Sequence, residues 1–277
     1  QLIQIKPDYV ISCGSQAARV SFILSRLKSI KSIHILKPNA LSRKNFSLII
    51  SPEHDKGRKN VYSHVVYTKI ALNLITPEYL AQQQEQLLLR YSHLKSNVRM
   101  KMGVLLGGNT KGVTYDVQQI RFLIKKIKEA ALHYNFDILL TTSRRTPKGV
   151  DEMLVKELRH FERCPLLIIA NEQNIPEAVG GILALSDILI VSGESISMVS
   201  EAVSSGKKTI VFSPNASYDT DVNTKYDQFV LGLSHQRYVL ASSIKDISLA
   251  INQVMSRKIS SKSIDDQQTI IQAIEAL

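Results

Sequence analysis

The chain has 277 residues, of which 44% are hydrophobic, a length and composition that suit two domains with buried cores. No apolar run reaches the roughly eighteen residues that a membrane-spanning helix needs, and the first residues do not resemble a signal peptide. Because the sequence starts without methionine and enters a strand-like stretch directly, we expect it to begin inside a longer chain. The composition therefore points to a two-domain globular protein.

Positive charge is concentrated at one end of the chain. The formal net charge is +11, and residues 1–60 hold eleven Lys or Arg residues against three Asp or Glu. Such a basic segment favours an anionic membrane surface or a phosphorylated lipid acceptor, although a solvated lysine-rich surface is the alternative. A nucleic-acid partner is not expected, because aromatic residues are few and no recognition motif is present.

The two cysteines, Cys13 and Cys164, have no metal-ligand spacing, so free thiols in a reducing compartment are the simple interpretation. We therefore expect a cytoplasmic protein, either free or bound peripherally to the inner face of a membrane.

The first part of the chain predicts an α/β unit. Its expected elements are strands at 9–13, 33–36, 48–50 and 62–67 and helices at 16–28 and 77–94. The first helix carries a set of its apolar residues on one face, namely Ala17, Val20, Leu24 and Leu27. Thr76 and Pro77 are the typical cap and first residue of the second helix. The polar, basic segment 95–101 is the predicted domain boundary.

The second part of the chain alternates strands and helices more regularly. The expected strands are 102–106, 137–142, 166–170, 188–191 and 209–212, and the helices are 115–134, 147–161, 176–185 and 195–205. Two further helices are expected at 243–257 and 263–277. Such alternation predicts a parallel sheet covered by helices on both faces. We accordingly expect an N-terminal domain of residues 1–97, a C-terminal domain of residues 98–259 and a terminal helix in 260–277.

Glycine, hydroxyl and arginine residues follow three strands of this second part, in the loops Gly107–Gly112, Thr141–Pro147 and Ser192–Ser195. Ligands of parallel α/β folds bind at the carboxyl ends of strands, where helix N-termini present free N–H groups. The glycine loop matches neither the dinucleotide fingerprint nor a P-loop. The sequence Gly-Lys-Lys-Thr at Gly206–Thr209 is similar to the end of a P-loop, but it follows a helix and precedes a strand, which is the wrong order for that motif. The sequence thus predicts a phosphate-bearing ligand and argues against dehydrogenases and P-loop NTPases.

Each loop has a proposed role and a simpler alternative. Gly107 and Gly108 would let the backbone approach a ligand closely, with hydrogen-bond donors from Asn109, Thr110 and Lys111, or they could serve only a tight turn. Arg144 and Arg145 would clamp a diphosphate, or they could be ordinary surface arginines.

The helix after the third loop supplies the remaining candidates. Ser195 and Ser197, at its N-terminus, could bind phosphate oxygens. Glu201, two turns later, could accept hydrogen bonds from the two hydroxyls of a ribose, although an exposed helical glutamate is unremarkable by itself. Glu194 would either cap the helix or bind a sugar hydroxyl.

In the first part of the chain, Glu53, His54 and Asp55 follow a strand and could reach a cleft between the domains. Histidine and carboxylates are the usual general bases, so catalysis by His54 or Asp55, with Glu53 beside them, is one hypothesis. A structural or solvated histidine is the alternative.

Four segments in register, Ser51–Asp55, Leu106–Gly112, Thr142–Pro147 and Val191–Ala202, resemble the mitochondrial-fission (elongated-mitochondria) family, which has many bacterial members. The resemblance covers roughly residues 7–240. It implies a GT-B glycosyltransferase-like fold, in which two Rossmann-like domains face each other across a cleft and the C-terminal one takes a nucleotide sugar. It adds Ser143 and Met198 to the nucleotide-sugar site. The plant member of the family is associated with recruiting a dynamin-related protein to mitochondria.

The family pattern differs from this chain at two places. An aspartate usually stands where this chain has Glu194, and an Asn-Pro-Tyr-like segment where it has Asn174–Glu177.

Three hypotheses follow. The preferred one is a metal-independent transferase, needing no cofactor, that moves a sugar from a nucleotide sugar to an envelope-associated acceptor. The second is a non-catalytic adaptor that binds a protein partner at a membrane surface, and the third is a nucleotide-sugar epimerase.

Overall fold

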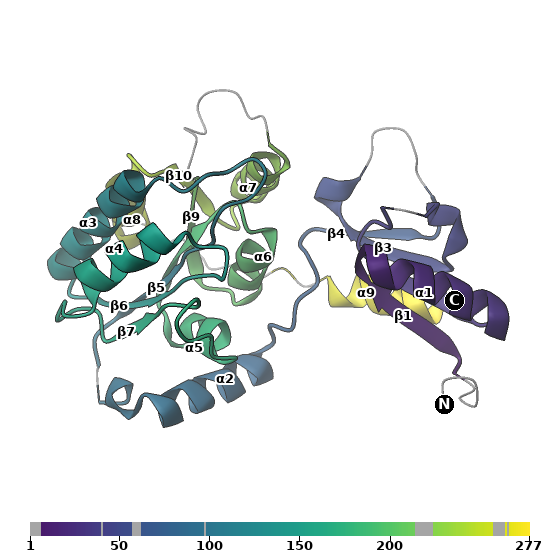
Figure 1. The fold of residues 1–277 in the computed structure, drawn as a ribbon, viewed down its shortest axis with the longest axis horizontal. Coiled ribbons are helices and arrows are strands. Elements are labelled where there is room, and N and C mark those ends of the chain that lie inside the picture. The colour runs from purple at the N-terminus through teal and green to yellow at the C-terminus, as the bar shows by residue number, and fades with distance from the viewer. Residues whose placement is uncertain are drawn as a thin grey trace. The chain divides into compact units, whose positions relative to one another are not determined.

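A computed structural model describes residues 7–39, 41–56, 62–96, 98–213, 224–256, 264 and 266–277. The chain forms two compact units, one of Gln1–Leu72 with Asp265–Leu277 and one of Asn73–Ile264 (Figure 1). The boundary expected at residues 95–101 thus differs from the observed one, because helix α2 (Pro77–Arg90) packs on a helix of the second unit. Part of the segment 260–277, expected to stand alone, returns to the first unit as helix α9 (Gln267–Glu275).

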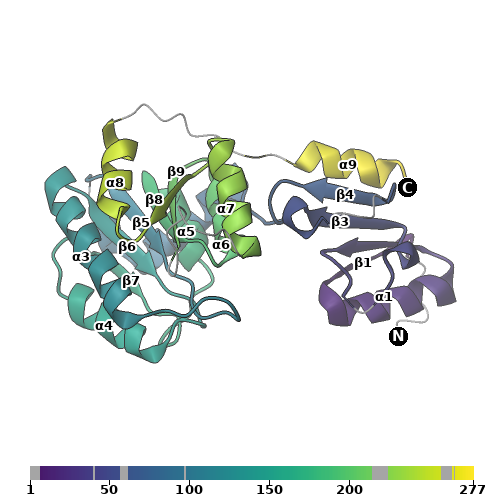
Figure 2. The same ribbon diagram turned by 90° about the horizontal axis from the view of Figure 1, so that it is seen from above.

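The first unit is a parallel four-stranded sheet in the order β1-β2-β3-β4. Its strands are β1 (Tyr9–Cys13), β2 (Lys31–Ile35), β3 (Leu48–Pro52) and β4 (Val65–Thr68). Helix α1 (Gly14–Lys28) covers one face and α9 the other (Figure 2). Neighbouring residues of β3 therefore pack on different helices: Ile49 joins a core with Ala18 of α1, whereas Ile50 joins one with Ile274 of α9.

Helix α1 does not bury the residues that its sequence pattern suggested. Val20 and Leu27 are exposed, and the buried residues of the helix are instead Ala18, Ser21 and Ser25. The sheet surface beneath the helix explains this choice, because the Ser12 hydroxyl and His34 Nδ1 are hydrogen-bonded there at 2.8 Å and both residues are buried. Small side chains allow a helix to approach such a surface closely, and large aliphatic ones would not fit there.

The second unit confirms the predicted α/β fold with a parallel six-stranded sheet in the order β10-β9-β8-β5-β6-β7. The strands are β5 (Lys101–Leu105), β6 (Asp137–Thr141), β7 (Leu166–Ile168), β8 (Ile188–Ser192), β9 (Lys208–Ser213) and β10 (Leu240–Ser243). The helices besides α2 are α3 (Val117–Tyr134), α4 (Lys148–Leu158), α5 (Ala178–Leu185), α6 (Ile196–Ser204), α7 (Lys225–His235) and α8 (Ile247–Ser256).

Helices cover both faces of this sheet (Figure 1). On one face α3, α4 and α8 share a core with β5, β6, β8 and β9, to which Ile124 and Phe136 contribute fully buried side chains. On the other face, Gly103 of β5 brings the sheet so close to α5 that a Cβ atom there would lie 3.0 Å from Ile182. The core thus fixes β5 between two helical layers.

Two elements of the second unit were not predicted, α7 and β10. The side chain of Thr224 accepts the Asp227 N–H at the start of α7, and Phe229, Val230 and Leu233 form its buried stripe. Residues 240–243 form an edge strand, so α8 begins at Ile247 and not at the expected residue 243. The expected helices 243–257 and 263–277 and the basic segment 1–60 extend partly outside the described residues.

Within the described ranges, no helix combines the length and the hydropathy needed to cross a membrane.

Candidate functional site

The three loops singled out in the sequence lie next to one another, because the strands that precede them are adjacent. Strand β5 pairs with β6 on one side and with β8 on the other. The chain order thus reverses at β5, which makes the carboxyl end of β5 the topological switch point of the sheet. Open α/β sheets bind their ligands at this point.

The glycine loop after β5 is hydrogen-bonded to residues at the carboxyl end of β8 and in the loop that follows it. The Gly107 N–H donates to Ser192 Oγ at 2.8 Å, and the Gly108 N–H donates to Glu194 Oε1 at 2.9 Å. We expected these two glycines to face a ligand, but both are buried and both N–H groups bind protein oxygens. Packing explains the glycines: a Cβ atom at Gly107 would lie 1.7 Å from Glu194 Oε1, and one at Gly108 would lie 2.2 Å from the Arg145 backbone.

Glu194 is the centre of this arrangement and is only 2% exposed. Its Oε1 atom also accepts the hydroxyl of Tyr115 at 3.0 Å and that of Ser192 at 3.3 Å. Burial raises the pKa of Glu194, and burial together with the Glu194 charge raises the pKa of Tyr115 well above its usual range. Sequence reasoning placed Glu194 at a helix cap or a sugar hydroxyl; in the structure its carboxylate holds the glycine loop, and Ser195 is the N-cap residue of α6.

The loop after β6 binds the glycine loop from the opposite side. Thr146 Oγ1 donates to the Gly107 carbonyl at 2.5 Å, and the Asn109 N–H donates to the Arg145 carbonyl at 3.1 Å. The sequence suggested only a helix start for Thr146, and it gave no reason to single out Tyr115. Both become recognisable as site residues only when the neighbouring strands bring their loops together.

The charged groups of these loops point outward. Lys111, Arg144 and Arg145 are all exposed, and the backbone that carries the arginines is braced by Ser143, whose Oγ accepts the Arg145 N–H at 3.1 Å. Asn109 is exposed as well, although its Oδ1 accepts the Tyr115 N–H at 2.8 Å. A hydrogen-bonded loop that presents exposed cations is suited to an anionic ligand.

Helix α6 begins at the end of β8 without a side-chain cap. The N-cap Ser195 is buried, and its hydroxyl makes no capping hydrogen bond. The first N–H groups of a helix have no acceptor within it, and the helix dipole favours an anion there. Ser197 is exposed in this first turn, beside the half-buried Met198.

Glu201 lies four residues after Ser197 and therefore on the same face of α6. Its side chain is half-buried, and burial raises its pKa to about 7. A carboxyl group in this environment changes its charge near neutral pH, and it can accept hydrogen bonds from hydroxyl groups of a ligand.

The residues predicted as general bases lie in the other unit. Strand β3 ends at Pro52, and Glu53–Asp55 form a short 3-10 turn directly after it. His54 Nε2 lies 3.9 Å from Asp55 Oδ2, and the imidazole is 8% exposed. Because these residues belong to the first unit and the three loops to the second, a catalytic role for them stays a prediction.

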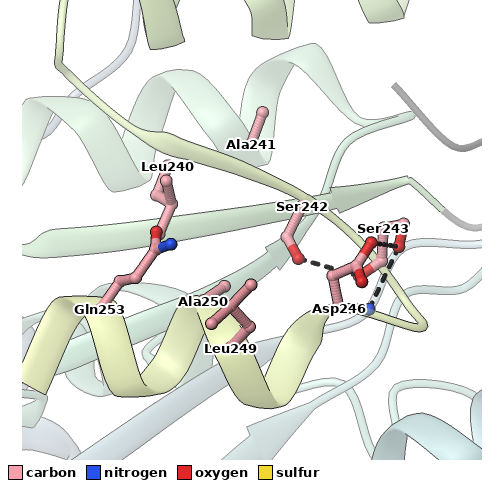
Figure 3. A pocket seen from close by; sticks show the side chains of 8 residues that line it. All are labelled: Leu240, Ala241, Ser242, Ser243, Asp246, Leu249, Ala250 and Gln253. Carbon is pink, nitrogen blue, oxygen red and sulfur yellow. Dashed lines mark hydrogen bonds between the residues drawn. The ribbon is translucent and has the colours of Figure 1, made fainter. Parts of the chain in front are cut away.

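A pocket of about 330 Å³ lies elsewhere on the second unit, between the edge strand β10 and helix α8 (Figure 3). Its lining contains none of the predicted site residues. Two of its polar groups satisfy each other: Ser243 Oγ donates to Asp246 Oδ2 at 2.5 Å and accepts the Asp246 N–H at 3.1 Å (Figure 3). These contacts lie in the turn between β10 and α8, and this local role accounts for both residues without a ligand.

Solved structures show the class of this fold. The chain is similar to the UDP-GlcNAc 2-epimerase of Neisseria meningitidis bound to UDP-GlcNAc, with a TM-score of 0.58 and 15% identity, over 100% of this chain and 78% of that one. It is also similar to the glycotransferase of kitacinnamycin, with a TM-score of 0.50 and 13% identity, over 99% of this chain and 71% of that one. The chain therefore has a GT-B-like α/β fold of two Rossmann-like units, each built on a parallel sheet.

The sequence itself shows the family. The family model described as "Mitochondrial fission ELM1" matches residues 2–275, and the chain belongs to this family. An uncharacterized protein, RP120, of Rickettsia prowazekii (strain Madrid E) is 27% identical over 241 residues, which are 76% of this chain and 66% of that protein. The match thus spans just under two thirds of the length of this bacterial relative.

Proposed function

We propose that the second unit binds a nucleotide sugar at the carboxyl ends of β5, β6 and β8, and that the protein is a metal-independent glycosyltransferase. Its acceptor in this proposal is associated with the cell envelope. The observation that carries the proposal is the α6 N-terminus, which has no side-chain cap, lies at the switch point of the sheet and is followed on one helix face by Ser197 and Glu201.

The diphosphate of the donor would lie against the start of α6. Backbone N–H groups and the helix dipole favour negative charge at that point. Lys111, Arg144 and Arg145 are exposed in the loops after β5 and β6, the two strands that follow β8 in the order of the sheet, and in this proposal they would add positive charge. The negative charge on the diphosphate grows as the sugar leaves it. Fixed dipoles and cations in place before the reaction would therefore stabilise the transition state without a metal ion.

The nucleoside would be held by Glu201. An ionised carboxylate can accept hydrogen bonds from the two neighbouring hydroxyls of a ribose, and charge-assisted hydrogen bonds of this kind are stronger than neutral ones. Because burial raises the pKa of Glu201 to about 7, nucleotide affinity is expected to increase as the pH rises from 6 to 8.

In the transfer step, an acceptor hydroxyl oxygen would attack the anomeric carbon while the bond from that carbon to the diphosphate oxygen breaks. The electron pair leaves with the diphosphate, and the hydroxyl proton passes to a general base. His54 and Asp55 are the predicted bases, with Glu53 beside them, and replacing His54 by Ala tests that assignment through the turnover rate.

Calorimetric titration with UDP, other nucleoside diphosphates and nucleotide sugars tests the proposal. Wild type is expected to bind at least one of them, and Glu201→Ala is expected to lower that affinity about tenfold or more, because two charge-assisted hydrogen bonds are lost. Glu152→Ala, which removes an exposed glutamate of α4, is the matched control and should bind like wild type.

Three other outcomes would contradict the proposal, and two of them would favour a different function. Absence of binding would refute the proposal and favour a non-catalytic adaptor. Turnover of a nucleotide sugar without any acceptor would favour an epimerase. Equal nucleotide affinities of wild type and Glu201→Ala would refute the assignment of Glu201 to the nucleotide site.

A further inference from the structure

The outward face of helix α1 is apolar. Val20, Ile23 and Leu27 are 57%, 54% and 76% exposed. Their spacings of three and four residues align them along one stripe of the helix. The stripe lies opposite the buried residues Ala18, Ser21 and Ser25, of which Ala18 packs on the sheet, so it faces away from the core of the first unit.

Helix α1 thus exposes large aliphatic side chains and buries small or polar ones. A surface helix of an α/β unit normally buries its large aliphatic residues and exposes polar ones. Single exposed hydrophobic residues are common and need no explanation, but a continuous stripe of three on one helix marks an interaction surface.

The charges around the stripe indicate what it contacts. Arg19 and Arg26 are exposed on α1 beside the apolar residues, and the helix contains no Asp or Glu between Gly14 and Lys28. The guanidinium of Arg26 lies 5.6 Å from the centre of the Phe22 ring, in a cation–π contact on the surface of the helix.

We propose that the outer face of α1 docks onto an anionic lipid bilayer. The helix would lie in the plane of the interface, with Val20, Ile23 and Leu27 entering the boundary between headgroups and acyl chains, and with Arg19 and Arg26 contacting the headgroup phosphates. An aliphatic stripe with cationic flanks and no acidic residue has the chemistry of interfacial helices, whose affinity combines apolar burial with attraction to anionic lipid. The surface lies on the first unit, and its binding to lipid requires no nucleotide.

Co-sedimentation with vesicles tests this surface on the full chain. The probes are vesicles of phosphatidylcholine alone and of phosphatidylcholine with about 30% phosphatidylglycerol, a fraction at which basic segments bind measurably. We expect binding to the anionic vesicles that decreases as salt is raised. The double variant Ile23→Ser, Leu27→Ser and the double variant Arg19→Gln, Arg26→Gln should each lower the partition coefficient about tenfold.

The matched control is Leu132→Ser, Leu249→Ser, which removes two comparably exposed leucines from α3 and α8 of the second unit. It should bind vesicles like wild type. Circular dichroism and the melting temperature of each variant verify folding, because all six positions are at the surface. Nucleotide titration of the α1 variants without lipid should match wild type, so a failure of this proposal is distinguishable from a failure of the proposed nucleotide site.

Several results would overturn the inference. One is equal partition of wild type and the Ile23→Ser, Leu27→Ser variant, and another is no binding of wild type to anionic vesicles. A third is self-association in light scattering that the α1 substitutions abolish while vesicle binding is unchanged, since the stripe would then be an interface with a second copy.

Discussion

The Gly108 N–H donates to Glu194 Oε1 across 2.9 Å, and this bond joins the loop after β5 to the loop after β8. The same glycine rests on the Arg145 backbone of the loop after β6. One residue thus connects the three strand ends at the switch point, and the geometry of the candidate nucleotide site depends on how closely it approaches its neighbours.

Gly108→Ala is expected to destabilise the protein by about 3 kcal/mol, the upper part of the range for inserting a methyl group into a packed site. The new Cβ atom would lie 2.2 Å from the backbone carbon and oxygen of Arg145, so the loops must separate. Urea unfolding measures the effect. Gly112→Ala is the control, because a Cβ atom there meets nothing within 4 Å; equal stability of the two variants would contradict the close packing described for Gly108.

Glu201 should make stability depend on pH. Its pKa is raised from 4.5 to about 7 in the folded protein, so the folded state favours the protonated form. The stabilisation is complete below about pH 4.5 and is lost as the pH rises to about 7. We expect the free energy of unfolding of wild type, relative to Glu201→Gln, to fall by about 2 kcal/mol over this interval.

Urea unfolding at pH 4.5, 5.5, 6.5 and 7.5 measures this difference. Glu152→Gln, at an exposed position of α4, should run parallel to wild type. A Glu201→Gln curve that also runs parallel would show that burial does not perturb this carboxyl.

Leu87→Ala should identify the unit to which α2 belongs. Leu87 is fully buried and contacts α5, where a Cβ atom on Gly181 would lie 2.6 Å from its Cδ2. Its truncation should cost about 2–5 kcal/mol, as for other buried leucines, and should affect the second unit. Leu89→Ala, on the exposed side of the same helix, should be nearly neutral in chemical denaturation. A loss confined to the first unit, seen by hydrogen exchange, would contradict this assignment of α2.

The two thiols should differ strongly in reactivity. Cys13 is exposed, whereas Cys164 is buried and its pKa is raised to about 12, mainly by desolvation. Because the thiolate is the reactive form, iodoacetamide at pH 8 should label Cys13 in the native protein and Cys164 only after unfolding. Mass spectrometry of wild type and Cys13→Ser follows both sites, and rapid native labelling of Cys13→Ser would refute the difference.

Much of the second unit was predictable because its strands and helices carry strong local patterns. The alternation from 102 to 212 matches β5 to β9 closely, since buried parallel strands are continuous apolar runs and their helices show a clear apolar face. Helix α7 has similar local signals, namely Thr224 as its N-cap residue and the buried residues Phe229, Val230 and Leu233. It was not predicted, because these residues follow a polar segment that is more typical of a loop. The short edge strand β10 has only four residues, too few for a periodic pattern.

The candidate site was predictable only in part. Residue types and loop positions indicated Gly107, Gly108, Arg144, Arg145 and Ser195, because strand ends in parallel sheets share one edge. The direction of each group was not predictable. The buried position of Glu194 depends on Tyr115 and Ser192, which approach it from different loops, and the contact of Thr146 with Gly107 depends on the pairing of β5 with β6.

The sequence by itself determined the α/β class, most elements of both units and the set of loops that surround the switch point, because these follow from local periodicity and from residues near one another in the chain. Only the tertiary structure decided which side chains of the three loops are buried and which are exposed, which unit contains α2 and α9, and which face of α1 stays outside. Those outcomes depend on side chains that are distant in sequence and meet through strand order and packing. Glu194 shows this most directly: it lies beside a predicted anion site, and its carboxylate is buried against Gly108.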